Sequence, residues 1–144
     1  VKAGRESMGA RLVPTDSAGI KALFQALRRG EIAGILPDHE PSRGTGVFAS
    51  FFGIQAYSMI LVPRLAQKTD ASVIFTFAER LPNAQGFHLH FLPADPEVSS
   101  SDLSVAAAAL NAGVERCVRI CPSQYQWGYK RFKSRPEGEE RFYP

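Results

Sequence analysis

The chain has 144 residues, 44% hydrophobic and 22% charged, a composition that suits about one globular domain and excludes disorder along the whole length. Its 17 Lys and Arg against 14 Asp and Glu leave a net charge of +3, which permits an anionic partner without requiring one. No apolar run approaches the roughly 18 residues of a membrane-spanning helix, so no span is predicted. The sequence begins at Val1 without a signal-peptide pattern, which indicates a fragment or a processed chain.

The first third of the chain predicts a strand, a helix and a second strand. Residues 10–14 form a short apolar run that ends at a proline, which is typical of a strand. The next segment, 15–30, has helical apolar spacing and can be capped by Asp16 or Ser17. Residues 31–36 are almost continuously apolar, as in a strand buried on both faces. This order predicts a parallel sheet with a crossover helix.

A polar, glycine-bearing loop over 37–53 follows the second strand directly, which would place it at the sheet edge where open α/β proteins bind ligands. Four further elements are predicted from apolar spacing and turn residues. They are a helix over 56–71 that starts late or kinks at Pro63, strands over 72–78 and 87–93, and a helix capped by Ser101 and Asp102 that ends near Ile120. The whole of 1–144 is therefore predicted to be one α/β domain with a mixed, largely parallel sheet flanked by helices.

Two histidine motifs could carry chemistry. His39 lies between two carboxylates in the loop, so it could act as a general base or metal ligand, or belong to a solvated turn. The sequence "HFLPAD" places Asp95 five positions after His90, a spacing that can pair an imidazole with a carboxylate. The alternative is that His88 and His90 simply alternate along a partly exposed strand face.

Other catalytic and cofactor motifs are missing from the sequence. The "GTG" at 44–46 lacks the spacing of a phosphate-binding loop or a dinucleotide fingerprint, and no serine lies in a Gly-x-Ser-x-Gly elbow. Cys117 and Cys121 are expected to be packed thiols rather than a disulfide or a zinc site. We therefore predict no cofactor and no metal.

The stretch "QYQWGYKRFKSRP" at 124–136 combines aromatic and cationic residues. It could dock on the core through its aromatics, form an anionic-ligand or membrane surface, or bind nucleic acid. Helical spacing would bring Trp127 near Arg131.

Several segments together resemble a known family. They are "GRESMGARLVP", "LFQALRRGEIAGILPDHEPSRGTGVFASFFGIQA", "LAQKTDASV" and "NAGVERCVRICPSQYQWGYKRFKSRPEG". In this order they resemble the bacterial lipid A biosynthesis acyltransferases, the lauroyl and myristoyl transferases of the lysophospholipid-acyltransferase-like superfamily. The resemblance covers nearly all 144 residues, and its most specific parts are the Leu-Pro-Asp-His loop and the aromatic, basic terminus.

The resemblance implies a glycerolipid-acyltransferase-like fold, here the C-terminal portion of an N-terminally truncated domain. It also implies acyl transfer from an acyl carrier protein thioester to a hydroxyl of a lipid A precursor, on the cytoplasmic side of the inner membrane. The family's general base is a His-x4-Asp/Glu motif, expected upstream of Val1. "HFLPAD" has that spelling in the wrong place, so His90 is not expected to be the base. The chain by itself is expected to be inactive.

The resemblance also assigns candidate site residues. Arg5 and Asp38 match positions tied to the active site: the arginine would bind a phosphate or the developing oxyanion, and the carboxylate would orient that arginine or the catalytic histidine. The terminus is expected to face an anionic membrane rather than nucleic acid, with some of its aromatics in the core. A non-catalytic lipid- or carrier-binding module of the same fold is the alternative. The expected substrate-binding residues are His39, Arg43, Lys130, Arg131, Lys133 and Arg135.

Overall fold

The computed structural model describes residues 9–144, and the chain divides into two compact units at Gly34. The described part of the first unit contains one helix, α2 (Ser17–Arg28). The Asp16 carboxylate caps this helix by accepting a hydrogen bond from the Gly19 N–H at 3.0 Å, as the sequence predicted. The strand predicted over residues 10–14 is wrong, because that stretch has no strand structure.

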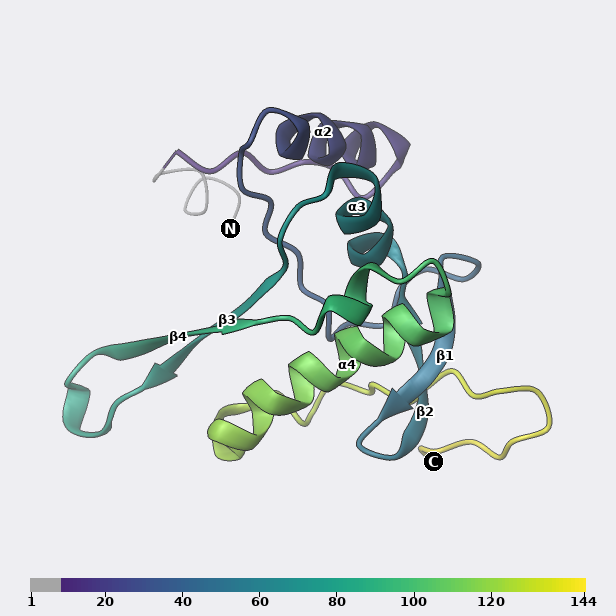
Figure 1. Ribbon diagram of the computed structural model, residues 1–144. Coiled ribbons are helices and arrows are strands. Elements are labelled where there is room, and N and C mark those ends of the chain that lie inside the picture. The colour runs from purple at the N-terminus through teal and green to yellow at the C-terminus, as the bar shows by residue number, and fades with distance from the viewer. Residues whose placement is uncertain (1–8) are drawn as a thin grey trace. The chain divides into compact units, whose positions relative to one another are not determined.

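The second unit, Ile35–Pro144, contains two antiparallel hairpins in place of a parallel sheet (Figure 1). Strand β1 (Gly46–Phe51) pairs with β2 (Ile54–Met59), and β3 (Ile74–Arg80) pairs with β4 (Phe87–Pro93). The prediction of a largely parallel sheet is therefore wrong for the described residues, although the mixture of helices and strands is as predicted.

The β1–β2 hairpin explains this difference. Phe52 and Gly53 both have positive φ, 50° and 80°, so a two-residue turn of the kind favoured in hairpins returns the chain on itself. The sequence predicted a loop over 37–53, where β1 lies, and a helix from 56, within β2. Neither strand was therefore predicted. The apolar run at 31–36 has no hydrogen-bonded partner strand among residues 9–144, and a strand needs such a partner to form a ladder.

The helices of the second unit follow the sequence more closely. Helix α3 (Leu61–Thr69) starts late, so that Pro63 lies in its first turn, where a missing N–H costs little. Helix α4 (Leu103–Ile120) is capped by the Asp102 carboxylate, which accepts from the N–H groups of the second and third residues that follow it. Three short 3₁₀ turns complete the unit: η1 (Pro82–Ala84), η2 (Pro96–Ser99) and η3 (Pro122–Gln124).

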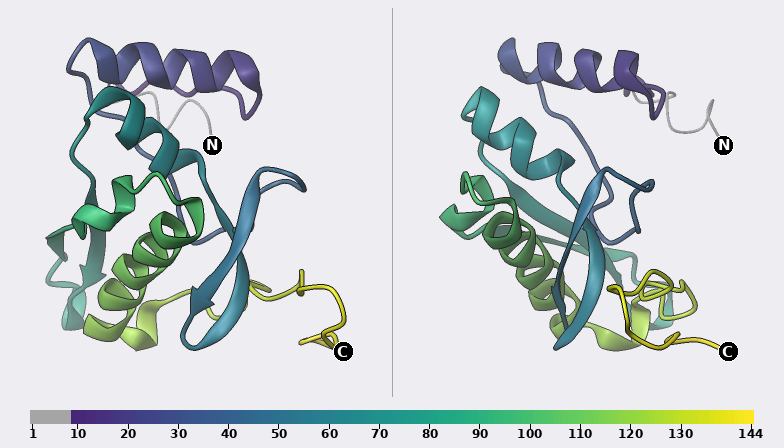
Figure 2. Two further views of the ribbon diagram at one scale, coloured as in Figure 1. Left: turned by 45° about the vertical axis from the view of Figure 1, so that its right-hand side comes forward. Right: turned by 90° about the vertical axis from the view of Figure 1, so that its right-hand side faces the viewer.

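Helix α4 organises the core of the second unit. It lies against the β1–β2 hairpin and against the base of β3, while the far end of the β3–β4 hairpin extends beyond it (Figures 1 and 2). None of the helices in the described part of the chain is long and apolar enough to cross a bilayer. The buried residues of the core are Phe51, Ala56, Phe75, Val98, Ala109, Leu110, Val114 and Val118.

A glycine in α4 allows β3 to pack closely. A Cβ on Gly113 would lie only 2.1 Å from the nearest ring atom of Phe75, which is 7% exposed. The absence of a side chain at this position therefore lets the phenyl ring lie against the helix backbone.

Gly113→Ala should destabilise the protein, although the same change in an exposed helix interior normally stabilises by about 0.5–1 kcal/mol. Overpacking against Phe75 should cost about 1–3 kcal/mol and lower the urea midpoint. Gly128→Ala is the control, because a Cβ there meets nothing within 4 Å. A midpoint for Gly113→Ala at or above that of the unmodified chain would contradict this close packing.

Candidate functional site

The structure brings together the loop after residue 36 and the aromatic, basic C-terminal segment. The His39 ring stacks on the ring of Tyr129, with centroids 4.7 Å apart and planes 25° apart. The Glu40 N–H donates a hydrogen bond to the Tyr129 hydroxyl at 2.9 Å, across 89 positions of sequence. The two most specific motifs of the sequence therefore form one surface.

Glu40 fastens the loop to the C-terminal segment through its charge. Its carboxylate accepts hydrogen bonds from the Ser134 hydroxyl at 2.7 Å and the Ser134 N–H at 3.2 Å. The Lys133 ammonium lies 3.9 Å from the same carboxylate, whose side chain is only 5% exposed. A buried carboxylate with two hydrogen-bond donors and a nearby ammonium is well compensated, so the loop has a defined position relative to the segment.

Arg131 is the most buried cation of the site, at 3% exposure. Its Nη1 donates to the Tyr57 carbonyl at 2.8 Å, and its Nη2 donates to the Ser58 hydroxyl at 2.8 Å and to Asn111 Oδ1 at 3.4 Å. The guanidinium also lies over the Phe51 ring, 5.3 Å from its centroid. One side chain thus connects the terminal segment to β1, β2 and α4.

The partners of Arg131 are themselves hydrogen bonded. The Ser58 hydroxyl donates to the Ala56 carbonyl at 2.9 Å and accepts from Asn111 Nδ2 at 2.8 Å. Asn111 Nδ2 also donates to the Ser50 carbonyl at 2.9 Å. Ser58 and Asn111 are 0% and 1% exposed, so this network replaces water inside the core.

The electrostatics of the site link Asp38 to this network. Burial lowers the pKa of the Arg131 guanidinium, and the nearby Tyr125, Tyr129, Glu40 and Asp38 oppose that shift. Burial, together with the negative charge of Asp38, raises the pKa of Tyr125 to about 12. The half-buried Asp38 therefore acts on both Arg131 and Tyr125 through space.

The four terminal cations that the sequence assigned to substrate binding have different surroundings. Arg131 is occupied by protein oxygens, and Arg135 donates to the Gln55 carbonyl at 2.7 Å and pairs with Glu139. Lys130 is exposed and lies 5.5 Å from the Tyr143 ring centroid, and Lys133 is 61% exposed. Arg131 and Arg135 thus donate hydrogen bonds to the chain itself, whereas Lys130 and Lys133 stay exposed to solvent while lying near Tyr143 and Glu40.

The terminal segment after Gln124 is not helical, so the helical spacing that was expected to bring Trp127 near Arg131 is wrong. Trp127 instead packs edge-on against Tyr125, with centroids 4.9 Å apart, and its indole N–H donates to the Pro122 carbonyl. Short turn hydrogen bonds hold the backbone of this segment. Tyr125 and Phe132 both pack against the core. Some of the aromatics therefore do serve the core, as predicted.

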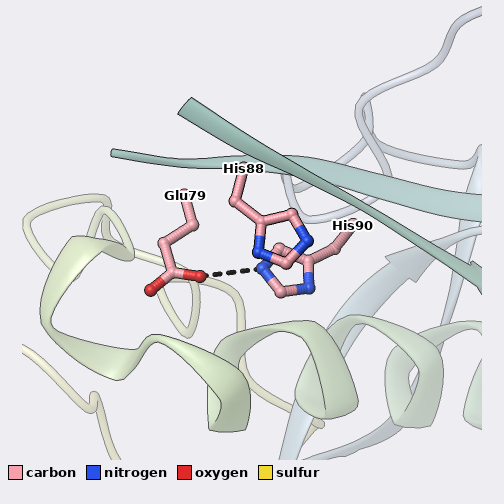
Figure 3. Close-up of side chains that lie close together, drawn as sticks. All are labelled: Glu79, His88 and His90. Atoms are coloured by element: carbon pink, nitrogen blue, oxygen red, sulfur yellow. Dashed lines mark hydrogen bonds and ion pairs between the residues drawn. The ribbon is translucent and has the colours of Figure 1, made fainter. Parts of the chain in front are cut away.

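The remaining candidates are placed as follows. Arg5 lies outside the described residues. Arg43 is exposed in the loop before β1. His90 pairs with Glu79 at 2.8 Å (Figure 3). The Asp95 carboxylate instead accepts from the Glu97 N–H at 2.9 Å and caps η2. "HFLPAD" thus forms no His–Asp pair in this structure.

Three residues of the site were missed by the sequence analysis: Tyr57, Ser58 and Asn111. The Tyr57 hydroxyl accepts from the N–H groups of Gly44 and Gly46 at 2.9 and 3.0 Å, which shapes the end of the loop. Asn111 did carry a usable signal, because it is a polar residue on the otherwise apolar, alanine-rich face of its helix.

Comparison with known sequences agrees with this arrangement of motifs. A family model described as bacterial lipid A biosynthesis acyltransferase matches residues 1–134. The chain belongs to this family. It is 33% identical over 124 residues to the lipid A biosynthesis lauroyltransferase of Escherichia coli K12, a match that covers 85% of the chain and 40% of that relative.

Two further relatives from the same strain give a similar picture. The chain is 28% identical over 125 residues to a lipid A biosynthesis palmitoleoyltransferase, and 27% identical over 135 residues to a lipid A biosynthesis myristoyltransferase. These matches cover 86% and 94% of the chain but only 40% and 42% of the relatives. The chain thus spans about two-fifths of the length of the curated proteins it matches.

Arg131→Lys should destabilise the protein by at least about 2 kcal/mol, because an ammonium cannot reproduce the forked donation to Tyr57 and Ser58, and hydrogen bonds to buried charged groups contribute roughly 1.5–3 kcal/mol each. Urea unfolding measures this change. Arg64→Lys makes the same substitution at an exposed position of α3 and should stay within about 0.5 kcal/mol. Equal effects of the two variants would contradict a structural role for Arg131.

Tyr125 should ionise late in an alkaline titration followed by absorbance at 295 nm. Its pKa rises from an ordinary value of 10 to about 12, so the folded chain keeps a proton that the unfolded chain loses. The contribution of this group to stability is complete below pH 10 and is lost as the pH rises toward 12. Tyr125→Phe should remove the late step, whereas Tyr143→Phe should retain it. Persistence of the step in Tyr125→Phe would contradict the assignment.

Proposed function

We propose that this chain takes part in transferring an acyl group from an acyl carrier protein thioester to a hydroxyl of a lipid A precursor, on the cytoplasmic side of the inner membrane. The observation that carries the proposal is the family match over residues 1–134. The relatives named as lauroyl-, palmitoleoyl- and myristoyltransferases of lipid A biosynthesis support the same class of reaction.

The reaction needs a base, an oxyanion site and two binding surfaces. A base takes the proton of the acceptor hydroxyl, whose oxygen attacks the thioester carbonyl. The new C–O ester bond forms, the C–S bond breaks, and the carrier thiol leaves with the proton. "HFLPAD" is the only His-x4-Asp/Glu spelling in the sequence, and His90 and Asp95 have other partners. We therefore assign the base to a part of the protein outside these 144 residues.

We assign Asp38, in the loop after residue 36, the role of positioning the catalytic groups. It lies half-buried next to a segment fastened by Glu40, so its carboxylate has a defined place on a rigid support. From there it would orient the catalytic histidine or Arg5, and Arg5 would bind an acceptor phosphate or the developing oxyanion. Arg131 serves this arrangement indirectly, because it supports the segment on which the loop rests.

The exposed groups of the same surface suit anionic and lipid partners. Arg43, Lys130 and Lys133 are exposed cations that can attract phosphates or an acidic carrier protein, and the exposed ring of His39 stacks on Tyr129, the residue before Lys130. Trp127 and Phe142 are 57% and 46% exposed, and aromatic rings at such positions favour a membrane interface. Together these side chains would bring the enzyme to the bilayer that holds its acceptor.

An acyl-transfer assay with carrier thioester and lipid A precursor tests this function. The 144-residue chain should be inactive, and activity should appear when upstream coding sequence is included. In the active form, Asp38→Asn should lower kcat/KM by about 10²-fold or more, because a misoriented base or arginine fails in the transition state. Asp70→Asn is the control, since asparagine suits the left-handed C-cap of α3.

The other outcomes of this assay separate the alternatives. Asp95→Asn should retain activity, because asparagine can still cap η2; its loss would identify "HFLPAD" as the working base. Binding to precursor-containing vesicles without transfer by any form would indicate a non-catalytic module. Steeply salt-dependent binding to oligonucleotides, with no affinity for vesicles, would indicate a nucleic-acid partner instead.

A further inference from the structure

Three potential metal ligands share one face of the β3–β4 hairpin. The strand register places Glu79 directly opposite His88, and His90 lies two positions further along the same strand. Side chains two positions apart point to the same side of a strand, so the register itself groups these three. Figure 3 shows the carboxylate and both imidazole rings projecting from the hairpin toward a common point.

The donor atoms of this cluster are already close together. His90 Nε2 lies 2.8 Å from Glu79 Oε2, and the two imidazole rings are 4.2 Å apart between centroids. One ligand atom from each of the three residues lies within 4.8 Å of the others. In a tetrahedral zinc site with bonds of about 2.0–2.1 Å, ligand atoms are about 3.3 Å apart, so the donor atoms would have to approach one another by up to about 1.5 Å.

We propose that Glu79, His88 and His90 form a binding site for a divalent transition-metal ion of the Zn²⁺ class. Two imidazole nitrogens and one carboxylate oxygen are a ligand set that zinc accepts, with water in the fourth position. Because Ca²⁺ and Mg²⁺ prefer oxygen ligands, the two imidazoles select against them. The spacing of one strand alone could not predict the site, because the carboxylate comes from the neighbouring strand.

The surroundings support ordered ligands with an open approach. Phe77 stacks on His90 with ring centroids 4.5 Å apart and planes 4° apart, which holds that imidazole in place. His88 is exposed, so an ion can reach the cluster from solvent. The Gln124 side chain accepts from the Arg80 N–H and donates to the Arg80 carbonyl, both at 2.9 Å, and thereby anchors the strand position next to Glu79 to η3.

Bound metal would connect the two strands near the turn of the hairpin. The ligands lie at positions that the backbone ladder already aligns, so the ion would cross-link the two strands without altering their register. An ion that binds the folded chain and not the unfolded chain must raise the thermal midpoint. Zinc-dependent stabilisation is therefore a readout that needs no enzymatic activity.

Titration of the full chain with Zn²⁺ against a chromogenic chelator tests the site, after Cys117 and Cys121 have been alkylated to remove competing thiolates. One ion should bind per chain, and Co²⁺ should give the d–d absorption of a four-coordinate nitrogen–oxygen site. His88→Gln should weaken Zn²⁺ binding more than about 10-fold, because even losses outside the ligand shell cost roughly 10–100-fold. Glu79→Gln should weaken it similarly.

His39→Gln is the matched control, since it removes the third histidine of the chain from a different surface and should leave Zn²⁺ affinity unchanged. Zinc should raise the thermal midpoint of the unmodified chain and of His39→Gln, but not of His88→Gln. Because His88 is exposed, His88→Gln should fold like the unmodified chain. Circular dichroism of the metal-free variant checks this. Equal Zn²⁺ affinities in His88→Gln and the unmodified chain, or a loss of binding in His39→Gln alone, would overturn the proposal.

Discussion

The burial of the Arg131 guanidinium is the constraint on which the arrangement of the second unit depends. Removing a cation from water costs several kcal/mol, and only well-placed acceptors and nearby negative charge can offset that cost. Here the acceptors come from β2 and from α4, and the Phe51 ring on β1 covers the guanidinium. The hairpin, the helix and the terminal segment must therefore be correctly placed for both terminal nitrogens of the guanidinium to be hydrogen bonded. Arg131 therefore favours this one arrangement of the three elements over alternatives that would leave its charge buried without acceptors.

The same constraint positions the surface on which the proposed chemistry depends. Because Arg131 holds the terminal segment against the core, Tyr129 and Ser134 are available to hold His39 and Glu40. The loop that follows residue 36 is thereby placed by tertiary contacts rather than by a parallel sheet. Arg131 and Arg135 are held by hydrogen bonds to the chain, so the exposed ammonium groups of Lys130 and Lys133 are the terminal cations best able to attract an anion.

The two hairpins show how local chain closure can replace the expected architecture. Each pairs neighbours in sequence through a short turn, which requires little loop-closure entropy. The β1–β2 hairpin supplies acceptors to the buried arginine, and the β3–β4 hairpin groups two histidines with a carboxylate from the opposite strand. The second grouping arises from the strand register, and the first from the packing of β2 and α4 around the terminal segment, so neither could be recognised from the spacing of residues along one strand.

Residue patterns alone were enough to predict α2 and α4 with their aspartate caps, the strands near 72–78 and 87–93, and membership of an acyltransferase family, because capping, apolar periodicity and motif order are local properties. Only the tertiary structure decided that the strands pair as hairpins, that Arg131 is buried, and that the Asp38 loop rests on the C-terminal segment. The physical reason is that hydrogen-bond partners and desolvation depend on residues distant in sequence. From the sequence alone, a cation such as Arg131 is expected at the surface, because its buried acceptors lie far from it along the chain.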